Sequence, residues 1–292
     1  MGVSMKRAVE LHITILLISF LFAVSCSSAP KDSGDNNETR VRTEKELALG
    51  NREAARGNFE NSLSILTECR RKAVSTDDPS LITRVCLSRG NVLFTLGKTD
   101  EAFAEWERAV AEAQALGNLE LLSVSRIFRA RGNLMSQKAP AQSVLDEVNR
   151  ESANIKSDRL YIAFSWQAKG LALRALGSYR EAEDALKRSL EIHEKDRHLE
   201  NASYDWYTIA SIRSLANNIQ GALQALEQAI TLDRRVENSW GLAASWRAMG
   251  DVYRKAGRAQ DAESAYSRAR EIYLAMGNAY EAEQTRIKSE EN

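Results

Sequence analysis

Few side chains in this 292-residue sequence are suited to catalysis or metal binding. It contains three histidines. His12 lies in an apolar N-terminal segment, and His193 and His198 stand five residues apart in "EIHEKDRHLE". Two histidines that share a metal on one helix are spaced i and i+4, so this separation turns the two rings apart. We interpret His193 and His198 as polar residues near a helix end and predict no metal site.

Other catalytic arrangements are also missing from the sequence. It has no "GxSxG" nucleophile elbow and no phosphate-cradling "GxxxxGK" loop. Paired carboxylates such as Glu181 and Glu183 lie among many other charges, which is typical of a solvated helix face. We therefore predict that the protein is not an enzyme and that it needs no cofactor.

The charge balance bears on possible partners. Lysine and arginine together number 40, and so do aspartate and glutamate. Proteins that bind nucleic acid through its phosphates normally have a basic excess or a basic stripe. This sequence has neither, so we expect no nucleic-acid partner.

The N-terminal segment has the pattern of an export signal. Lys6 and Arg7 precede an apolar run over residues 11–24, which is shorter than the roughly 20 residues that a membrane-spanning helix needs. The run ends in "FAVSC", and Ala23 to Cys26 resembles the bacterial lipobox, in which the cysteine is acylated and becomes the mature N-terminus. We expect a signal peptide at 1–25 and a lipid anchor, palmitate included, on Cys26. The alternative is a signal peptide followed by an incidental cysteine.

Residues 26–42 carry almost nothing apolar, which indicates a flexible tether. Ser27, rather than an aspartate, follows the cysteine, and this resembles Gram-negative lipoproteins that are sorted to the outer membrane. The expected location is therefore the bacterial outer membrane, facing the periplasm. Retention in the inner membrane stays open.

Residues 43–292 repeat a pattern about every forty residues. "SRGNVL" at 88–93 returns as "ARGNLM" at 130–135. A bulky residue four positions before the shared small residue, and small residues twelve and nineteen after it, would lie on helix faces that pack together. Helix pairs of this kind bury their apolar faces only by stacking into a solenoid. The small residues, at intervals of 40, 42, 38, 40 and 40, are Gly50, Gly90, Gly132, Gly170, Ala210 and Gly250.

The last unit carries a family resemblance. "SWRAMGDVYRKAGRAQDAESAYSRARE" at 245–271 resembles a tetratricopeptide repeat, with Trp246, Gly250, Gly257 and Tyr266 on signature positions of that family. The 40-residue unit resembles its longer-helix branch. The resemblance implies an all-α, right-handed superhelical solenoid over 43–292, with about six helix pairs and a C-terminal capping helix.

Cys69 and Cys86 leave two interpretations open. Both lie at core positions of helices joined by a turn near Asp77, which would hold them at similar height. Export favours a disulfide between them. Two free thiols packed as small apolar residues are the alternative.

The resemblance further implies that the first helix of each pair lines a concave groove. An asparagine there could bond to the backbone of an extended peptide, and arginine beside tyrosine or phenylalanine is typical of binding hot spots. The predicted peptide-binding residues are Asn51, Arg84, Asn91, Arg126, Arg129, Asn133, Phe164, Arg174, Tyr204, Tyr207, Arg247 and Arg254.

These observations predict a lipid-anchored, non-catalytic scaffold that binds a protein or an extended peptide. Assistance in assembling an envelope complex is the expected role. Two alternatives remain, a self-associating structural lipoprotein of the envelope and a periplasmic ligand-binding partner of a transporter. The oligomeric state stays open.

Overall fold

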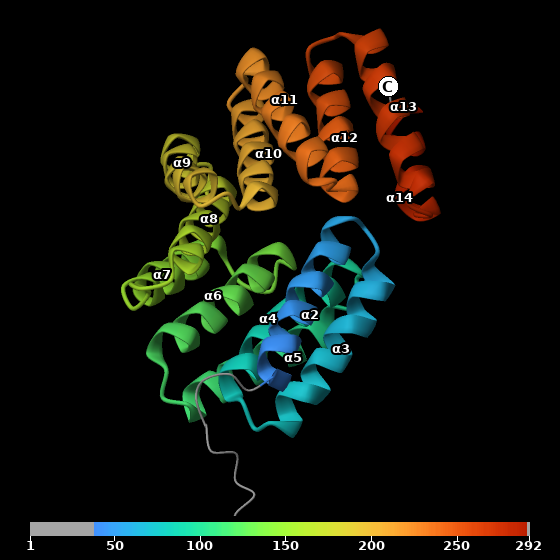
Figure 1. Ribbon diagram of the computed structural model, residues 1–292. Coiled ribbons are helices and arrows are strands. Elements are labelled where there is room, and N and C mark those ends of the chain that lie inside the picture. The colour runs from blue at the N-terminus through green and yellow to red at the C-terminus, as the bar shows by residue number, and fades with distance from the viewer. Residues whose placement is uncertain (1–37, 291–292) are drawn as a thin grey trace, which may run out of the picture. The chain divides into compact units, whose positions relative to one another are not determined.

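The computed structural model describes residues 38–290, and every regular element in that range is a helix (Figure 1). The predicted all-α class is confirmed. The signal peptide, Cys26 and most of the predicted tether lie outside the described residues. In chain order the helices are α2 (Glu38–Ala55), α3 (Phe59–Ser75), α4 (Pro79–Thr95), α5 (Thr99–Ala115), α6 (Leu119–Met135), α7 (Ala141–Ser152), α8 (Arg159–Ala175), α9 (Tyr179–Lys195), α10 (Leu199–Leu215), α11 (Ile219–Val236), α12 (Ser239–Lys255), α13 (Ala259–Ala275) and α14 (Ala279–Glu290).

Local sequence sets where these helices begin and turn. Helix α4 starts with Pro79, and Asp78 accepts a hydrogen bond from the backbone N–H of Leu81 at 2.9 Å. Proline suits the first helical position because its missing N–H has no intrahelical partner there. Gly97 and Gly257, in the turns between paired helices, have φ of 75° and 72°. Glycine reaches this region without a Cβ clash, which lets the chain reverse between the two helices of a pair.

The repeat is more regular than the sequence alignment predicted. The first helices of five pairs start at residues 79, 119, 159, 199 and 239, a constant interval of 40. The left-handed turn residue within the pairs follows the same interval, from Gly97 through Gln137 to Gly177. The predicted intervals of 42 and 38 around the third unit are therefore wrong. The residue equivalent to Gly90 in the third unit is Ala130 and not Gly132.

Trp106 explains why the third unit carries a second small residue at Gly132. A Cβ on Gly132 would lie 2.2 Å from Trp106 Cζ3, and one on Gly90 would lie 2.3 Å from Trp106 Nε1. The indole therefore occupies the space beside both glycines. At the position of Gly132 the neighbouring units have Val92 and Ala172, since no tryptophan fills that space there.

The core lies between successive helices of the solenoid. Ala102, Ala109 and Ala182 are fully buried at the small positions predicted for the second helices. Trp166 and Trp246 are partly buried and pack against this core. Small residues let the helix axes approach, and the large rings fill the space beside them.

The superhelix brings the turn between α2 and α3 against the turn between α11 and α12. Arg56 Nη2 lies 2.5 Å from Glu237 Oε2, across 181 positions of sequence. The rings of Phe59 and Trp240 meet edge to face with centroids 4.9 Å apart. Figure 1 shows α2 and α3 beside the lower end of α12. These contacts join the first unit to the region where the last pair begins.

The start of the first described helix differs from the prediction, and the last helix matches it. Helix α2 begins at Glu38, so residues 38–42, which were predicted as tether, are helical. Helix α14 occupies the place predicted for a capping helix. Within residues 38–290, no helix combines the length and the apolar character that crossing a membrane requires.

Candidate ligand-binding site on the inner helices

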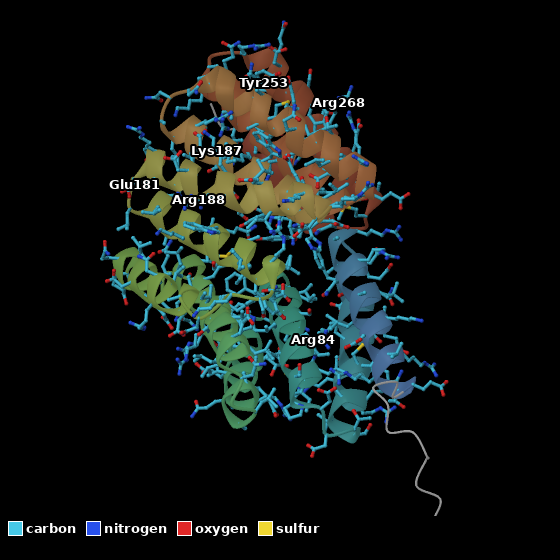
Figure 2. The ribbon with its side chains drawn as sticks, turned by 60° about the vertical axis from the view of Figure 1, so that its left-hand side comes forward. Arg84, Glu181, Lys187, Arg188, Tyr253 and Arg268 are labelled. Carbon is cyan, nitrogen blue, oxygen red and sulfur yellow. The ribbon has the colours of Figure 1, made fainter. Side chains whose placement is uncertain are left out.

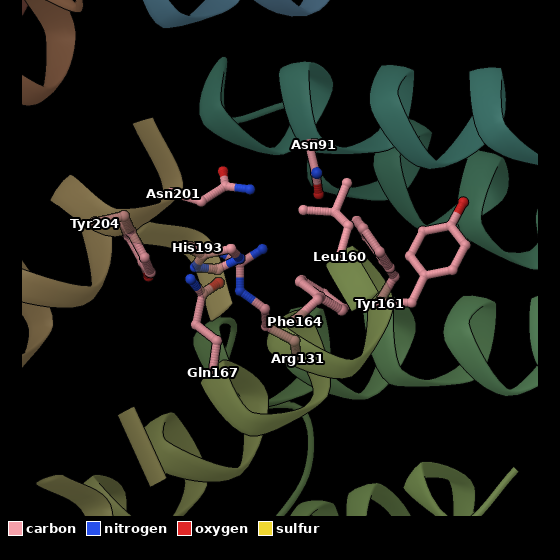
Figure 3. Close-up of a pocket in the computed structure, with 10 residues that line it drawn as sticks. Asn91, Arg131, Leu160, Tyr161, Phe164, Gln167, His193, Asn201 and Tyr204 are labelled. Atoms are coloured by element: carbon pink, nitrogen blue, oxygen red, sulfur yellow. The ribbon is translucent and has the colours of Figure 1, made fainter. Parts of the chain in front are cut away.

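The first helices of the pairs line a cavity of about 320 Å³, which we call the Arg131 cavity (Figure 3). Helices α4, α6, α8 and α10 contribute most of its wall, and α9 contributes one residue. The lining residues are Asn91, Phe128, Arg131, Leu160, Tyr161, Phe164, Gln167, His193, Asn201 and Tyr204.

Arg131 lies at the groove position of the third unit, because the constant interval of 40 makes it equivalent to Asn91. Its guanidinium carbon is 5.8 Å from the ring centroid of Phe164 and 5.7 Å from that of Tyr204. Such cation–π contacts fix the side chain but leave its N–H groups available. Its Nε is buried without a hydrogen-bond partner, and no carboxylate within residues 38–290 forms an ion pair with it.

His193 lies in the last turn of α9, near a helix end as predicted, and its side chain is buried. Only 1% of it is exposed, and its Nδ1 lies 2.8 Å from Asp205 Oδ2. Gln167 Nε2 donates to the other oxygen of Asp205 at 2.9 Å. The His193 Nε2 atom has no partner. One signal in the sequence could have shown this burial, since the equivalent positions two and three units earlier hold Ala113 and Ala73, both core residues.

A second cavity, of about 370 Å³, lies farther along the inner helices, and we call it the Trp240 cavity. Both of its arginines are engaged, since Arg174 Nη1 donates to Ser211 Oγ at 3.0 Å and Arg247 Nη1 lies 2.5 Å from Glu281 Oε2. Burial raises the pKa of its Asp233 to about 6. Its lining includes Arg174, Tyr204, Tyr207, Asp233, Trp240, Arg247 and Tyr273.

Six of the twelve predicted groove residues line these cavities. Asn91 and Phe164 lie in the Arg131 cavity, and Arg174, Tyr207 and Arg247 lie in the Trp240 cavity. Tyr204 lines both. These six residues therefore lie on the walls of cavities formed mainly by the first helices of the pairs.

The arginines taken from the wrong register in the third unit point elsewhere. Arg126 Nη1 lies 3.3 Å from Glu151, and Arg129 Nη2 lies 3.3 Å from Glu147. Both carboxylates belong to α7, a second helix of a pair. Arg126 and Arg129 therefore bind the outer helix and line neither cavity.

Two further predicted arginines are held by other groups. Arg84, on α4 (Figure 2), donates to Glu44 at 2.7 Å, and Arg254 donates to the backbone oxygen of Lys288 at 2.6 Å. Neither lines the Arg131 cavity or the Trp240 cavity.

The three asparagines predicted to line the groove, Asn51, Asn91 and Asn133, do not all occupy equivalent positions. Asn133 is equivalent to Leu93 and Leu173, which are buried core residues, so it does not share the position of Asn91. Asn51 is exposed and lines neither cavity. In the third unit the groove position belongs to Arg131, which the sequence alignment missed because it followed the "RGN" motif.

Both cysteines of the described range are free thiols, so the bridge that the sequence left open is not formed. Cys69 Sγ donates to the backbone oxygen of Thr43 at 3.8 Å. Burial raises the pKa of Cys69 to about 11 and that of Cys86 to about 12. Within residues 38–290, no group of three His, Cys, Asp or Glu side chains is placed to hold a metal ion.

Comparison with known families and proteins agrees with the repeat. Residues 202–275 match a family model described as tetratricopeptide repeat, and residues 169–195 match a second model with the same description. These two segments therefore match tetratricopeptide repeats. The chain is also 29% identical over 127 residues to the photosystem I assembly protein Ycf3 of Rippkaea orientalis. The aligned residues are 41% of this chain and 72% of that protein.

Solved structures share the fold at low identity. BtubC (BKLC) from P. vanneervenii aligns with a TM-score of 0.53 at 17% identity, over 82% of this chain and 93% of that one. A Rap protein complexed with Competence and Sporulation Factor aligns with a TM-score of 0.57 at 15% identity, over 84% of this chain and 72% of that one. A chain of the APC/C hetero-tetramer Cut9-Hcn1 aligns with a TM-score of 0.57 at 13% identity, over 89% of this chain and 47% of that one. These likenesses confirm the predicted solenoid of stacked helix pairs.

Proposed function

We propose that this protein is a non-catalytic scaffold that binds a protein or an extended peptide along the inner helices of its superhelix. The observation that carries the proposal is that the Arg131 cavity and the Trp240 cavity lie in sequence along these helices and share Tyr204. A solenoid leaves a long inner surface, and buried aromatic and arginine side chains are the residues that contribute most to binding.

The names of the similar proteins support a binding role. The Rap protein was solved in complex with Competence and Sporulation Factor, and Cut9-Hcn1 is a hetero-tetramer. Ycf3 is named for assembly of photosystem I. Each of these names refers to a complex or to its assembly, which fits the binding role that we propose for this chain.

The sequence pattern supports a place for the scaffold in the cell envelope. The basic residues Lys6 and Arg7, the short apolar run and Cys26 fit a lipoprotein signal, with the mature protein anchored by Cys26 to the outer membrane and facing the periplasm. We propose that the anchored scaffold helps to assemble an envelope complex. Membrane fractionation of wild type and Cys26→Ser tests the anchor, since only wild type should sediment with membranes.

Photo-crosslinking in the native host tests the inner-surface proposal. A photoreactive residue placed at position 204 should capture a polypeptide partner, because Tyr204 lines both cavities. The matched position is Arg188 on α9, whose guanidinium carbon lies 4.6 Å from the ring centroid of Trp166 and which lines neither cavity. Equal capture from both positions would contradict the proposal. Capture of a second copy of this chain alone would favour the self-associating alternative.

A further inference from the structure

The turn between α2 and α3 packs against the turns on either side of the helix pair α12 and α13. Arg56 Nη2 lies 2.5 Å from Glu237 Oε2, just before α12, and the Phe59 ring meets the Trp240 ring edge to face. A Cβ on Gly57 would lie 2.0 Å from Cε of Met276, just after α13. The first helix pair therefore contacts the sixth pair, and the superhelix closes on itself.

The forty-residue repeat alone does not call for this closing contact. A glycine takes the place of Gly57 in three other pairs, and a Cβ on Gly97, Gly177 or Gly257 would meet no atom within 4 Å. Leu116 is equivalent to Met276 in an earlier unit and is 43% exposed, whereas Met276 is partly buried. The closing contact therefore depends on side chains particular to these three turns.

This contact is slight compared with the interfaces inside the solenoid. Successive helix pairs share one continuous buried core. The side chains of Arg56 and Glu237, in contrast, are 39% and 72% exposed, and an exposed ion pair stabilises little. Local opening begins where few buried apolar contacts hold a structure together. We therefore expect the closing contact to separate while the helix pairs stay folded.

Trp240 links the closing contact to a cavity. Its ring centroid lies 4.9 Å from that of Phe59 on one side and 5.6 Å from that of Tyr273. Trp240, Tyr273 and Ala244, which lies one helical turn farther along α12, all line the Trp240 cavity. Withdrawal of Phe59 would leave the Trp240 ring unsupported on that side, so the cavity wall could move.

We infer that the first helix pair is a latch, which closes the superhelix against the sixth pair and whose release opens the Trp240 cavity to a ligand. The latch residues are Arg56, Gly57, Phe59, Glu237, Trp240 and Met276. The inference adds a moving part to the proposed scaffold. Its tests need no partner, so its failure would leave the scaffold proposal standing.

Gly57→Asn should release the latch, because its side chain needs the space that Met276 fills. Asparagine suits the backbone of this turn, since Asn217 holds the same position of the fifth pair with φ of 62°. Gly177→Asn is the matched control, because Gly177 has φ of 79° and no atom lies within 4 Å of its added Cβ.

The distance across the latch can be measured by pulsed electron paramagnetic resonance on the purified full chain. Spin labels are attached to Glu60→Cys and Arg235→Cys, which replace exposed residues on either side of the contact. Both native thiols of residues 38–290 are buried and should stay unlabelled. Gly57→Asn should lengthen and broaden the label distance, and Gly177→Asn should leave it as in wild type.

A charge exchange keeps the test decisive if Met276 yields to the new asparagine. Arg56→Glu places two carboxylates together and should also lengthen the label distance. Adding Glu237→Arg to this variant restores an ion pair of opposite sense and should shorten the distance again. If neither Gly57→Asn nor Arg56→Glu lengthens the distance, the latch is overturned.

Thiol labelling tests whether release opens the cavity. Ala244→Cys puts a small thiol in the wall, and the probe is a maleimide carrying a polyethylene glycol chain. Its rate of reaction should rise about fivefold or more in Gly57→Asn, the factor by which a clash of this kind shifts a two-state equilibrium. The rate in Gly177→Asn should match wild type. A longer label distance with an unchanged rate at position 244 would overturn the link between the latch and the cavity.

Discussion

His193 Nδ1 lies 2.8 Å from Asp205 Oδ2 across the interface between α9 and α10, and both side chains are buried. The interface between α5 and α6 has Ala113 and Ser125 at the same two positions. At the α9–α10 interface a histidine and a carboxylate thus occupy the positions that hold two small residues at the α5–α6 interface. The histidine also lines the Arg131 cavity.

Removing one member of this pair should destabilise the fold strongly. Asp205→Ser leaves His193 Nδ1 buried without its hydrogen-bond partner, and a buried polar group that loses its partner costs about 1–3 kcal/mol. His193→Ala with Asp205→Ser reproduces the Ala113 and Ser125 pair, so the double variant should lose less than the sum of the two single variants. Urea unfolding of the four proteins measures this coupling, and strictly additive losses would contradict it.

Sequence reasoning identified the fold because its signal is spread over the whole chain. A forty-residue repeat of small and bulky positions survives individual departures such as Glu46 at a bulky position, since each helix pair packs only on its neighbours. The family resemblance carried by this repeat also implied the C-terminal capping helix, at the place of α14.

The candidate site was predicted in part, for a local reason. "RGN" at 131–133 copies "RGN" at 89–91, yet the first copy places Asn91 in the cavity and the second places Arg131 there. Gly132 of the second copy packs against Trp106, which leaves no room for a side chain there. This contact joins neighbouring units, so no single motif reveals it. The buried role of His193 depends on Asp205 in the next helix, which spacing along one helix could not show.

Glu120 should stabilise the chain in a pH-dependent way. It accepts hydrogen bonds from the backbone N–H groups of Lys156, Ser157 and Asp158 at 2.9, 2.8 and 3.1 Å. Burial acts to raise its pKa, but these bonds and the Ser157 hydroxyl lower the pKa to about 2 from an ordinary 4.5. A lowered pKa means that the stabilisation is present above pH 4.5 and is lost as pH falls toward about 2.

The test compares thermal melts of wild type and Glu120→Gln across this pH range. The variant should melt below wild type at neutral pH, and the gap should close as pH falls toward about 2. Glu101→Gln, in the first turn of α5, is the matched control and should show no such closure. A gap independent of pH would contradict the role assigned to the Glu120 carboxylate.

The two buried thiols should resist alkylation in the folded protein. Burial raises the pKa of Cys69 to about 11 and that of Cys86 to about 12, so almost no thiolate is present at mildly alkaline pH. The thiolate is the reactive form. Iodoacetamide followed by mass measurement should label neither cysteine in the native chain and both after denaturation without reductant. Labelling that requires reductant would instead show a disulfide.

Gly132→Ala should change stability in opposite directions in two backgrounds. In wild type the new Cβ would meet Trp106 Cζ3 at 2.2 Å, and overpacking of this kind costs about 1–3 kcal/mol. In Trp106→Leu, which takes the residue found at Leu186 and Leu226, the clash is gone. There the alanine should stabilise α6 by about 0.5–1 kcal/mol, because glycine disfavours a helix interior by that amount relative to alanine.

Chemical unfolding of wild type, the two single variants and the double variant decides whether Trp106 is the reason for Gly132. Trp106→Leu alone should be less stable than wild type, since the space beside Gly90 and Gly132 is left unfilled. The diagnostic quantity is the sign of the Gly132→Ala effect in each background, which does not depend on the size of that loss. The same destabilisation in both backgrounds would mean that another neighbour restricts Gly132. The register of the third unit, and with it the groove position of Arg131, would still follow from the helix bounds and from the left-handed turn at Gln137.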